Sequence, residues 1–190
     1  MDGSKNELIT NLLKSRNRDF RNFHSLPIVS KANQQQLDTD NLEKGIAFEK
    51  FVVRHFDDQY FHLIEWRSDK NVNGISALMN KLPDLEFYFQ LGNDTLQFAV
   101  ECKWGRYFHN YLFDLKDSHL NTYRKYQEVT GHPVFMVIGI GNIATSPREV
   151  YIIPLNHITK NKLHEFEMQI YKRSNPDHNF FLDFSRKSLK

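Results

Sequence analysis

The fold is decided by Leu82-Pro83-Asp84-Leu85-Glu86-Phe87 and, beyond the turn Gly92-Asn93-Asp94, by Ala99-Val100-Glu101-Cys102-Lys103. Both segments alternate apolar and polar residues with a period of two, which predicts two strands. The turn predicts an antiparallel hairpin with a loop slightly longer than the minimum. The start of the first strand then lies beside the end of the second, so we expect Asp84 close to Glu101 and Lys103.

Two carboxylates beside one ammonium group are the donors of a site for a hard cation. Mg²⁺ prefers oxygen ligands and often takes only one or two protein carboxylates together with water and substrate phosphate. Such an ion activates water and offsets charge on a scissile phosphate. We expect Lys103 to orient or deprotonate that water, or to stabilise the transition state. The alternative is a cross-strand salt bridge on a half-solvated sheet, which contributes little.

A third carboxylate comes from an upstream helix. Apolar residues recur at helical spacing from Asn41 to Phe56, and Thr39-Asp40-Asn41 with Glu43 predicts its N-terminal cap. Glu49 flanks the apolar stripe of this helix, so its side chain is not expected to point straight at water. The alternative is an ordinary exposed glutamate.

The remaining pattern gives an order of elements. An aromatic run at 60–66 predicts a strand before the hairpin, and a helix is predicted from Asp117 to Thr130, ended by Gly131-His132-Pro133. The apolar run 134–140 predicts a strand buried on both faces, and 149–153 predicts another. The sequence therefore predicts an α/β protein with the order α, β, β, β, α, β.

Pro83-Asp84, Glu101-x-Lys103 and the helix Gly45-x-x-Phe48-Glu49-x-x-Val52 together resemble the PD-(D/E)XK nuclease superfamily, in its Holliday-junction resolvase and Mrr-like branch. The resemblance covers roughly residues 41–154. It implies a restriction-endonuclease-like core with a mixed central sheet flanked by helices, and a DNA endonuclease using Mg²⁺ or Mn²⁺. It also implies the site residues, which are the metal ligands Asp84, Glu101, Glu49 and the backbone carbonyl of Cys102, with Lys103 as the catalytic lysine.

Length and composition set the broad class. A chain of 190 residues, 40% hydrophobic and 14% aromatic, suits one domain with a sizeable core. No apolar run approaches the about 18 residues of a membrane span, and the N-terminus lacks a signal-peptide pattern, so we expect a cytoplasmic protein without a membrane partner. The single cysteine, Cys102, agrees with a reducing compartment. It is interpreted as a small core residue, with a catalytic thiol as the alternative.

The ends of the chain differ from this core. Residues 1–40 are interpreted as a helical arm, with helical spacing at 7–20, followed by a glutamine-rich linker, and residues 41–190 as the nuclease-like domain. In the tail we expect a helix over 161–171. The aromatic segment 180–184 is expected to add an edge strand or to cover the sheet.

Positive charge gathers around the predicted site although the net charge is only +2. We expect these residues to contact DNA phosphates: Arg67, Lys70, Lys81, Arg106, Arg124 and Lys125. The loop 104–111 interleaves aromatic residues with Arg106 and either stacks on unpaired bases or caps the edge of the sheet. The nine histidines show no zinc-ligand spacing.

Two functions remain after these observations. The first is a Mg²⁺-dependent endonuclease acting on DNA, expected to be a homodimer when it cuts duplexes because one site cleaves one strand at a time. The second is a non-catalytic nucleic-acid-binding or scaffold domain of the same fold. Converging carboxylates favour the enzyme, since they repel one another unless a cation is present.

Overall fold

The computed structural model describes residues 31–67 and 82–190, and the account below concerns the unit Thr39–Lys190. The predicted order α, β, β, β, α, β is confirmed, with one short strand inserted before the second helix. The elements of this core are α2 (Lys31–Arg54), β1 (Phe61–Trp66), β2 (Leu85–Leu91), β3 (Asp94–Gly105), β4 (Leu112–Asp114), α3 (Asp117–Thr130), β5 (Val134–Ile140) and β6 (Glu149–Pro154).

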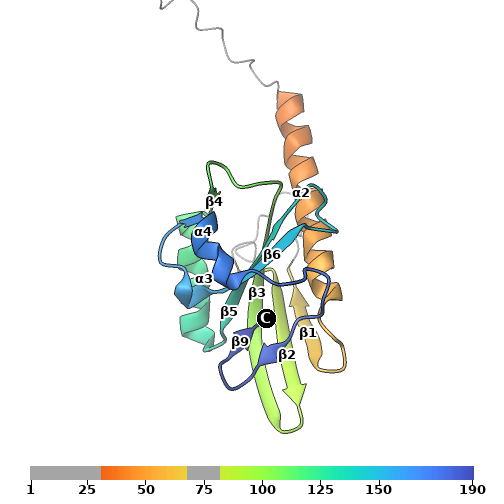
Figure 1. Cartoon of the computed structure of the whole chain (residues 1–190), viewed down its shortest axis with the longest axis vertical. Coiled ribbons are helices and arrows are strands. Elements are labelled where there is room, and N and C mark those ends of the chain that lie inside the picture. The colour runs from red at the N-terminus through yellow and green to blue at the C-terminus, as the bar shows by residue number, and fades with distance from the viewer. Residues whose placement is uncertain (1–30, 68–81) are drawn as a thin grey trace, which may run out of the picture. The chain divides into compact units, whose positions relative to one another are not determined.

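The centre of the protein is a five-stranded mixed sheet in the order β1-β2-β3-β5-β6. Its neighbours pair antiparallel except β3 and β5, which run parallel and are joined through α3. The helices α2 and α3 flank the sheet (Figure 1). This is an α/β fold of the class predicted from the sequence.

The hairpin β2–β3 has the predicted pairing but a shorter loop than expected. Leu91 lies opposite Asp94, so the loop is the two residues Gly92 and Asn93, and Gly92 adopts a positive φ of 61°. A two-residue loop with glycine at its first position matches the right-handed twist of the paired strands. The register brings Leu85 opposite Val100, which sets Asp84 beside Glu101 at the end of the hairpin.

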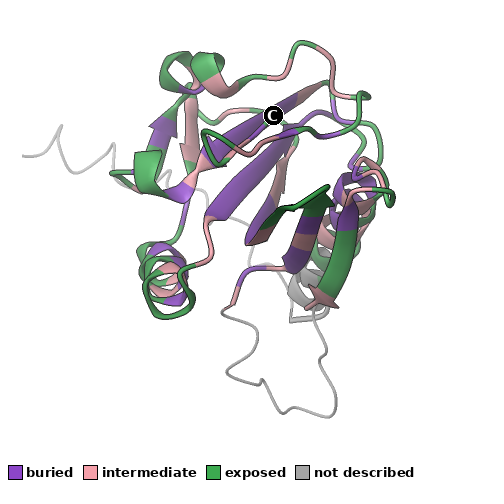
Figure 2. Ribbon diagram, turned by 90° about the horizontal axis from the view of Figure 1, so that it is seen from below, coloured by how far each residue is buried: buried purple, intermediate pink, exposed green. Residues whose placement is uncertain are grey.

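Side chains of the sheet alternate between two cores. One core packs the face carrying Val100 and Cys102 against α2, and the other packs the face carrying Ala99 and Met136 against α3. All of β5 is buried, as its continuous apolar run predicts. Figure 2 shows buried residues filling the central strands.

The helix α2 begins earlier than the sequence suggested. Lys31 opens it, so the predicted cap at 39–41 is wrong, and the predicted linker is helical from residue 31 onward. The predicted arm at 7–20 lies outside the described residues. Phe48 fixes the other half of the helix on the sheet, because its ring lies where a Cβ of residue 139 would stand and residue 139 is glycine. This contact determines where the next residue, Glu49, is placed.

The second helix of the core, α3, has the bounds that the sequence predicted. Gly131 ends it in the left-handed conformation, with φ 73°, and donates its N–H to the carbonyl of Gln127 at 2.9 Å. Glycine adopts this conformation without a steric penalty.

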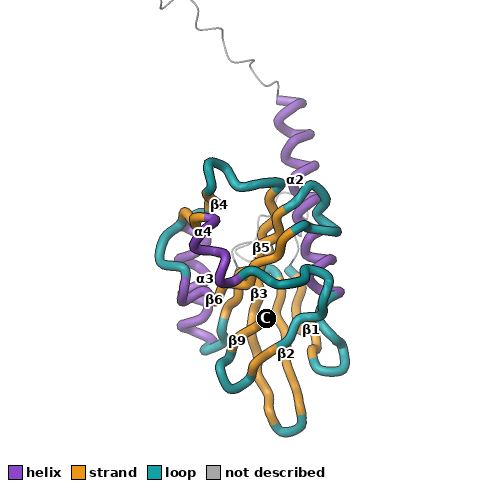
Figure 3. The backbone as a smooth tube through the Cα atoms, viewed as in Figure 1, coloured by secondary structure: helices purple, strands orange, loops and turns teal. Residues whose placement is uncertain are grey.

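The C-terminal region corrects one prediction. Residues 161–171 do not form one helix, because β7 (Lys162–His164) pairs with β4 and only the short helices α4 (Glu165–Met168) and η4 (Gln169–Tyr171) follow. Another short helix, η3 (Leu155–His157), precedes them, and β8 (Leu182–Asp183) pairs with β9 (Ser188–Leu189). Figure 3 shows the long connection from β3 to β4. Within the described part of the chain, no helix is long and apolar enough to cross a membrane.

Candidate active site

A pocket of about 780 Å³ lies where the end of β3 meets the start of β2 and the helices α2 and α3. Its wall includes the three carboxylates and the lysine singled out from the sequence, together with two residues of α3. These six residues are Glu49, Asp84, Glu101, Lys103, His119 and Tyr123. Segments far apart in the chain therefore meet in one concavity.

Asp84 directly precedes β2, and hydrogen bonds to its backbone and to its side chain hold it in place. The backbone N–H of Arg67 donates to the Asp84 carbonyl at 2.7 Å, and the Arg67 guanidinium donates to the carbonyl of Pro83 at 3.0 Å. Oδ2 of Asp84 accepts the backbone N–H of Cys102 at 2.8 Å. These bonds fix the direction of the carboxylate relative to β3.

Glu101 is the most deeply buried carboxylate of the site, with 1% of its surface exposed. Oε1 accepts two bonds, from the hydroxyl of Tyr123 at 2.5 Å and from Nζ of Lys103. Oε2 is buried and has no hydrogen-bond partner among the residues that the structure describes. A buried carboxylate oxygen without a partner is costly unless a cation or a donor reaches it.

Glu49 is buried rather than exposed, which contradicts the alternative of an ordinary surface glutamate. Its Oε2 accepts Nε1–H of Trp66 at 2.6 Å, so the carboxylate is tied to β1 as well as to α2. The packing of Phe48 on Gly139 sets the depth of this turn of the helix. Glu49 thereby enters the same pocket as Asp84.

The charges of the pocket act on one another. Burial, together with the carboxylates of Glu101 and Glu49, raises the pKa of Asp84 well above its ordinary value. Burial lowers the pKa of Lys103, but the carboxylates of Glu101 and Asp84 more than offset this, so its pKa rises above the usual range. Lys103 therefore carries its proton at neutral pH, and the carboxylates of Glu49, Asp84 and Glu101 concentrate negative charge beside it.

Cys102 faces the core, as predicted. Its side chain is 8% exposed and belongs to the apolar cluster under α2. Burial and the carboxylates of Asp84 and Glu49 raise the pKa of the thiol well above its ordinary value. Only the thiolate is a good nucleophile, so the thiol is not activated. The backbone carbonyl of Cys102 stays a predicted metal ligand.

The donors of the pocket fit a hard divalent cation. Among residues 31–67 and 82–190, no group of three or more Asp, Glu, His or Cys side chains is arranged to hold a metal ion by itself. Mg²⁺ needs only one or two protein carboxylates, since water and substrate oxygens complete its shell. The unpartnered Oε2 of Glu101 and the raised pKa of Asp84 are the features that an added positive charge would relieve.

The predicted DNA-contacting residues divide into groups. Arg67 and Arg106 line the pocket, whereas Arg124 and Lys125 are exposed on α3 outside its wall. Arg67 is largely buried and forms an ion pair with Glu86, so its guanidinium is engaged inside the protein. Lys70 and Lys81 lie outside the described residues.

Tyr123 and Trp66 are contributors that sequence reasoning missed. Tyr123 stands at helical spacing from Leu120 and Tyr126, and all three side chains are buried, so the pattern indicates a core position. Trp66 ends an aromatic strand, and its position likewise indicates a core residue. No sequence signal separates a tyrosine that packs from one that also bonds a carboxylate 22 residues upstream.

Comparison with protein-family models finds no match, and comparison with curated protein sequences finds none either. Among solved structures, the chain is similar to Hjc, a Holliday junction resolvase from the archaeal hyperthermophile Archaeoglobus fulgidus. The match covers 66% of this chain and 93% of that one, with 14% sequence identity and a TM-score of 0.48. Function is therefore inferred from the residues of the pocket.

Proposed function

We propose that this protein is an endonuclease of the PD-(D/E)XK type that hydrolyses phosphodiester bonds in DNA and depends on a divalent cation. One observation carries the proposal. A single pocket holds the carboxylates of Glu49, Asp84 and Glu101 beside the ammonium of Lys103, and one buried oxygen of Glu101 has no partner in the described part of the chain. The large majority of buried side-chain polar atoms in folded proteins have a hydrogen-bond partner, so this oxygen calls for an explanation such as a bound cation.

Asp84 and Glu101 would hold the cation, with Glu49 and the backbone carbonyl of Cys102 as the further proposed ligands. When bound, Mg²⁺ or Mn²⁺ would polarise the scissile phosphate and acidify a water molecule. The chain's own part is to keep these oxygens in place before substrate arrives. The N–H of Cys102 does this for Asp84, and Tyr123 does it for Glu101.

Lys103 would act as a cation rather than as a free base. Its pKa is raised by the neighbouring carboxylates, so Nζ keeps its proton and already donates to Glu101 Oε1. A protonated amine at this position orients the attacking water and offsets charge that develops on the phosphate. Of the three roles that the sequence left open for Lys103, we therefore propose orientation of the water and stabilisation of the transition state, and not deprotonation of the water.

DNA would lie across the pocket on its exposed cations. Arg106 stands at the wall of the pocket, and Lys70, Lys81, Arg124 and Lys125 are the other proposed phosphate contacts. Arg67 is proposed to contact DNA only in addition to its ion pair with Glu86. Such contacts give affinity without base specificity and make binding weaken as salt rises.

A homodimer is proposed for cleavage of duplexes, because a single site cuts one strand at a time. Two apolar residues of the aromatic segment 180–184 are not free for such a contact. Phe180 and Leu182 pack into the core beneath α2. Light scattering at micromolar concentration tests the assembly. A strict monomer that makes concerted double-strand breaks would rule the dimer out.

From the single cysteine we also propose a reducing, cytoplasmic location.

The second candidate is a non-catalytic nucleic-acid-binding or scaffold domain. The observation that favours it is the closed part of the network, where Glu101 Oε1 already takes bonds from Tyr123 and Lys103. A scaffold needs such bonds for rigidity. It has no need for the unpartnered Oε2, which is why the enzyme is the first candidate.

Incubation with plasmid, junction and single-stranded DNA, with and without Mg²⁺ or Mn²⁺, separates the two candidates. We expect metal-dependent cleavage that Lys103→Ala and Asp84→Asn each reduce by about 100-fold or more. Glu128→Gln is the matched control, because Glu128 is an exposed carboxylate of α3 outside the pocket wall. DNA binding without cleavage under every metal condition would assign the scaffold function instead. Cleavage that survives chelator would contradict the proposed mechanism.

A further inference from the structure

The long connection from β3 to β4 folds into a tight hairpin at the rim of the pocket. Its two-residue turn is Asn110-Tyr111, closed by reciprocal backbone bonds of 2.9 Å between His109 and Leu112. Both turn residues have positive φ, 50° and 62°, which is the conformation of a type I′ turn. Asparagine accepts this conformation readily, whereas tyrosine does so at a cost, so the surrounding structure must hold the turn in place.

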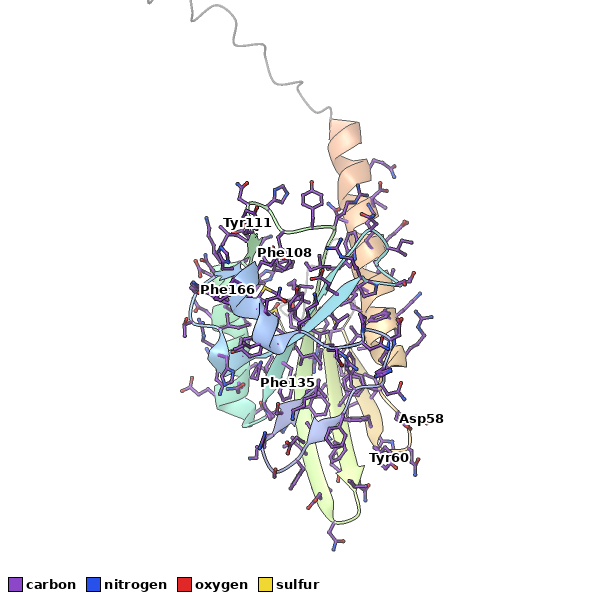
Figure 4. All side chains as sticks on the ribbon, viewed as in Figure 1. Asp58, Tyr60, Phe108, Tyr111, Phe135 and Phe166 are labelled. Carbon is purple, nitrogen blue, oxygen red and sulfur yellow. The ribbon has the colours of Figure 1, made fainter. Side chains whose placement is uncertain are left out.

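The hairpin is anchored from behind. Phe108 is half-buried and packs edge-to-face on Tyr151 at 6.0 Å between ring centroids. The backbone N–H of Glu165 donates to the carbonyl of Tyr111 at 2.8 Å, and β4 pairs with β7. Figure 4 labels Phe108, Tyr111 and Phe166 at the same end of the protein. The hairpin is therefore a built element and not a loose loop.

Side chains of the hairpin alternate between this anchor and the pocket. Tyr107 and His109, on either side of Phe108, line the pocket wall, and their ring centroids are 5.1 Å apart. Tyr107 is 57% exposed although it is a large aromatic residue. Arg106 precedes it and lines the same wall. Two exposed rings and a cation thus border the space that holds the carboxylates.

We propose that Tyr107 and His109 form a stacking platform for unpaired bases of a DNA strand whose phosphate enters the pocket. This inference rests on the proposed function and narrows its substrate to DNA that presents unpaired nucleotides beside the cleaved bond. Stacking on an exposed aromatic ring strengthens binding of a base, and this contact is open to a base that is not already stacked in a duplex. Arg106 adds attraction for the adjacent phosphate.

The other use of this loop, capping the apolar edge of the sheet, explains a different residue. Phe108 performs that role, because it is the member of the loop that packs on the core between the sheet and α3. Tyr107 and His109 face the other way and line the pocket. Capping does not explain why the rings of Tyr107 and His109 are exposed, whereas stacking on a base requires exposed rings.

The test is equilibrium binding in chelator, followed by fluorescence anisotropy, so that cleavage plays no part. The probes are a short thymine homopolymer, the same backbone with abasic sites, and a blunt duplex. We expect Tyr107→Ala to weaken homopolymer binding by about 10-fold, and Tyr107→Phe to leave it close to wild type. Binding of the abasic strand and of the duplex should change little. Tyr111→Ala is the control, since Tyr111 is an exposed tyrosine of the same hairpin outside the pocket wall.

Three outcomes overturn the inference. Equal losses on the homopolymer and abasic probes would show that Tyr107 contacts the backbone or supports the fold. Equal losses in the Tyr107→Ala and Tyr111→Ala proteins would show a general effect on the hairpin. A wild-type protein that does not bind the homopolymer would remove the platform altogether. Failure of the proposed function is separate, because it appears as DNA binding that depends on Tyr107 without cleavage when metal is added.

Discussion

Two carboxylates at the beginning of the β2–β3 hairpin have opposite environments. Glu86 lies in β2, and Asp84, two positions earlier, directly precedes that strand. Both oxygens of Glu86 are engaged, Oε2 by Arg67 and Oε1 by Gln97 at 2.7 Å. Although burial alone would raise the pKa of Glu86, these donors lower it, whereas the pKa of Asp84 is raised.

The difference lies in what surrounds each carboxylate. Glu86 meets a guanidinium and an amide, so its negative charge is matched inside the protein. Asp84 meets two further carboxylates, and Lys103 is already bonded to one of them. A buried carboxylate that is paired with a cation of the protein stabilises the fold. A carboxylate surrounded by other carboxylates favours binding of a cation from solvent. The network around Glu86 is therefore interpreted as structural and the pocket as functional.

The largest expected effect is the loss of the structural pair. Arg67→Ala leaves the Glu86 carboxylate buried without its cation and should destabilise the protein by about 3–5 kcal/mol in urea unfolding. Arg148→Ala is the control, because Arg148 makes an exposed ion pair with Glu149 and should change stability by no more than about 1 kcal/mol. Similar losses in the two variants would mean that Arg67 is not a structural residue.

The next effect belongs to the pocket. A divalent ion at about 100 times its Kd should stabilise the wild type by about 2.7 kcal/mol, and chelator should reverse this. Asp84→Asn should abolish most of the gain, because the ligand charge is lost. Thermal unfolding with and without Mg²⁺ or Mn²⁺ measures it. A gain that survives Asp84→Asn would place the cation elsewhere in the protein.

A smaller effect links the pocket to the packing of α2. Gly139→Ala puts a Cβ into the Phe48 ring, and overpacking of this kind costs about 1–3 kcal/mol. Because Phe48 precedes Glu49, the variant should also weaken the response to divalent ions. Gly45→Ala is the control, since nothing lies within 4 Å of its added Cβ and alanine favours a helix by about 0.5–1 kcal/mol. An unchanged melting temperature for Gly139→Ala would contradict this packing.

The smallest effect is a pH-dependent gain in stability when Asp84 is replaced by asparagine. The pKa of Asp84 is higher in the folded protein than in the unfolded chain, so wild-type stability falls as pH rises from about 3.9 through the raised folded value. Asparagine does not titrate but keeps an acceptor for the Cys102 N–H. In chelator, Asp84→Asn should therefore melt higher than wild type at neutral pH and equally near pH 3. A lower melting temperature at neutral pH would show that the charged form of Asp84 is stabilising.

The parts of the structure that local pattern controls were predicted well. The period-two segments and the short turn place Asp84 beside Glu101, and Gly131 marks the end of α3. The predictions were wrong where the local pattern is weak. Residues 31–40 are polar and glutamine-rich, yet they are helical, and lysine, alanine, glutamine and leucine in this stretch are all good helix formers. The stretch at 161–171 has helical spacing, but pairing of β7 with β4 takes its first residues.

By itself, the sequence determined the order of elements, the face of each strand and the residue types at the site. Alternation and turn chemistry act between near neighbours, so they can be read along the chain. Only the tertiary structure decided that Arg67 pairs with Glu86, that Tyr123 donates to Oε1 of Glu101, and that Glu49 is buried. These contacts join residues distant in sequence, and whether a buried charge is matched depends on every group around it.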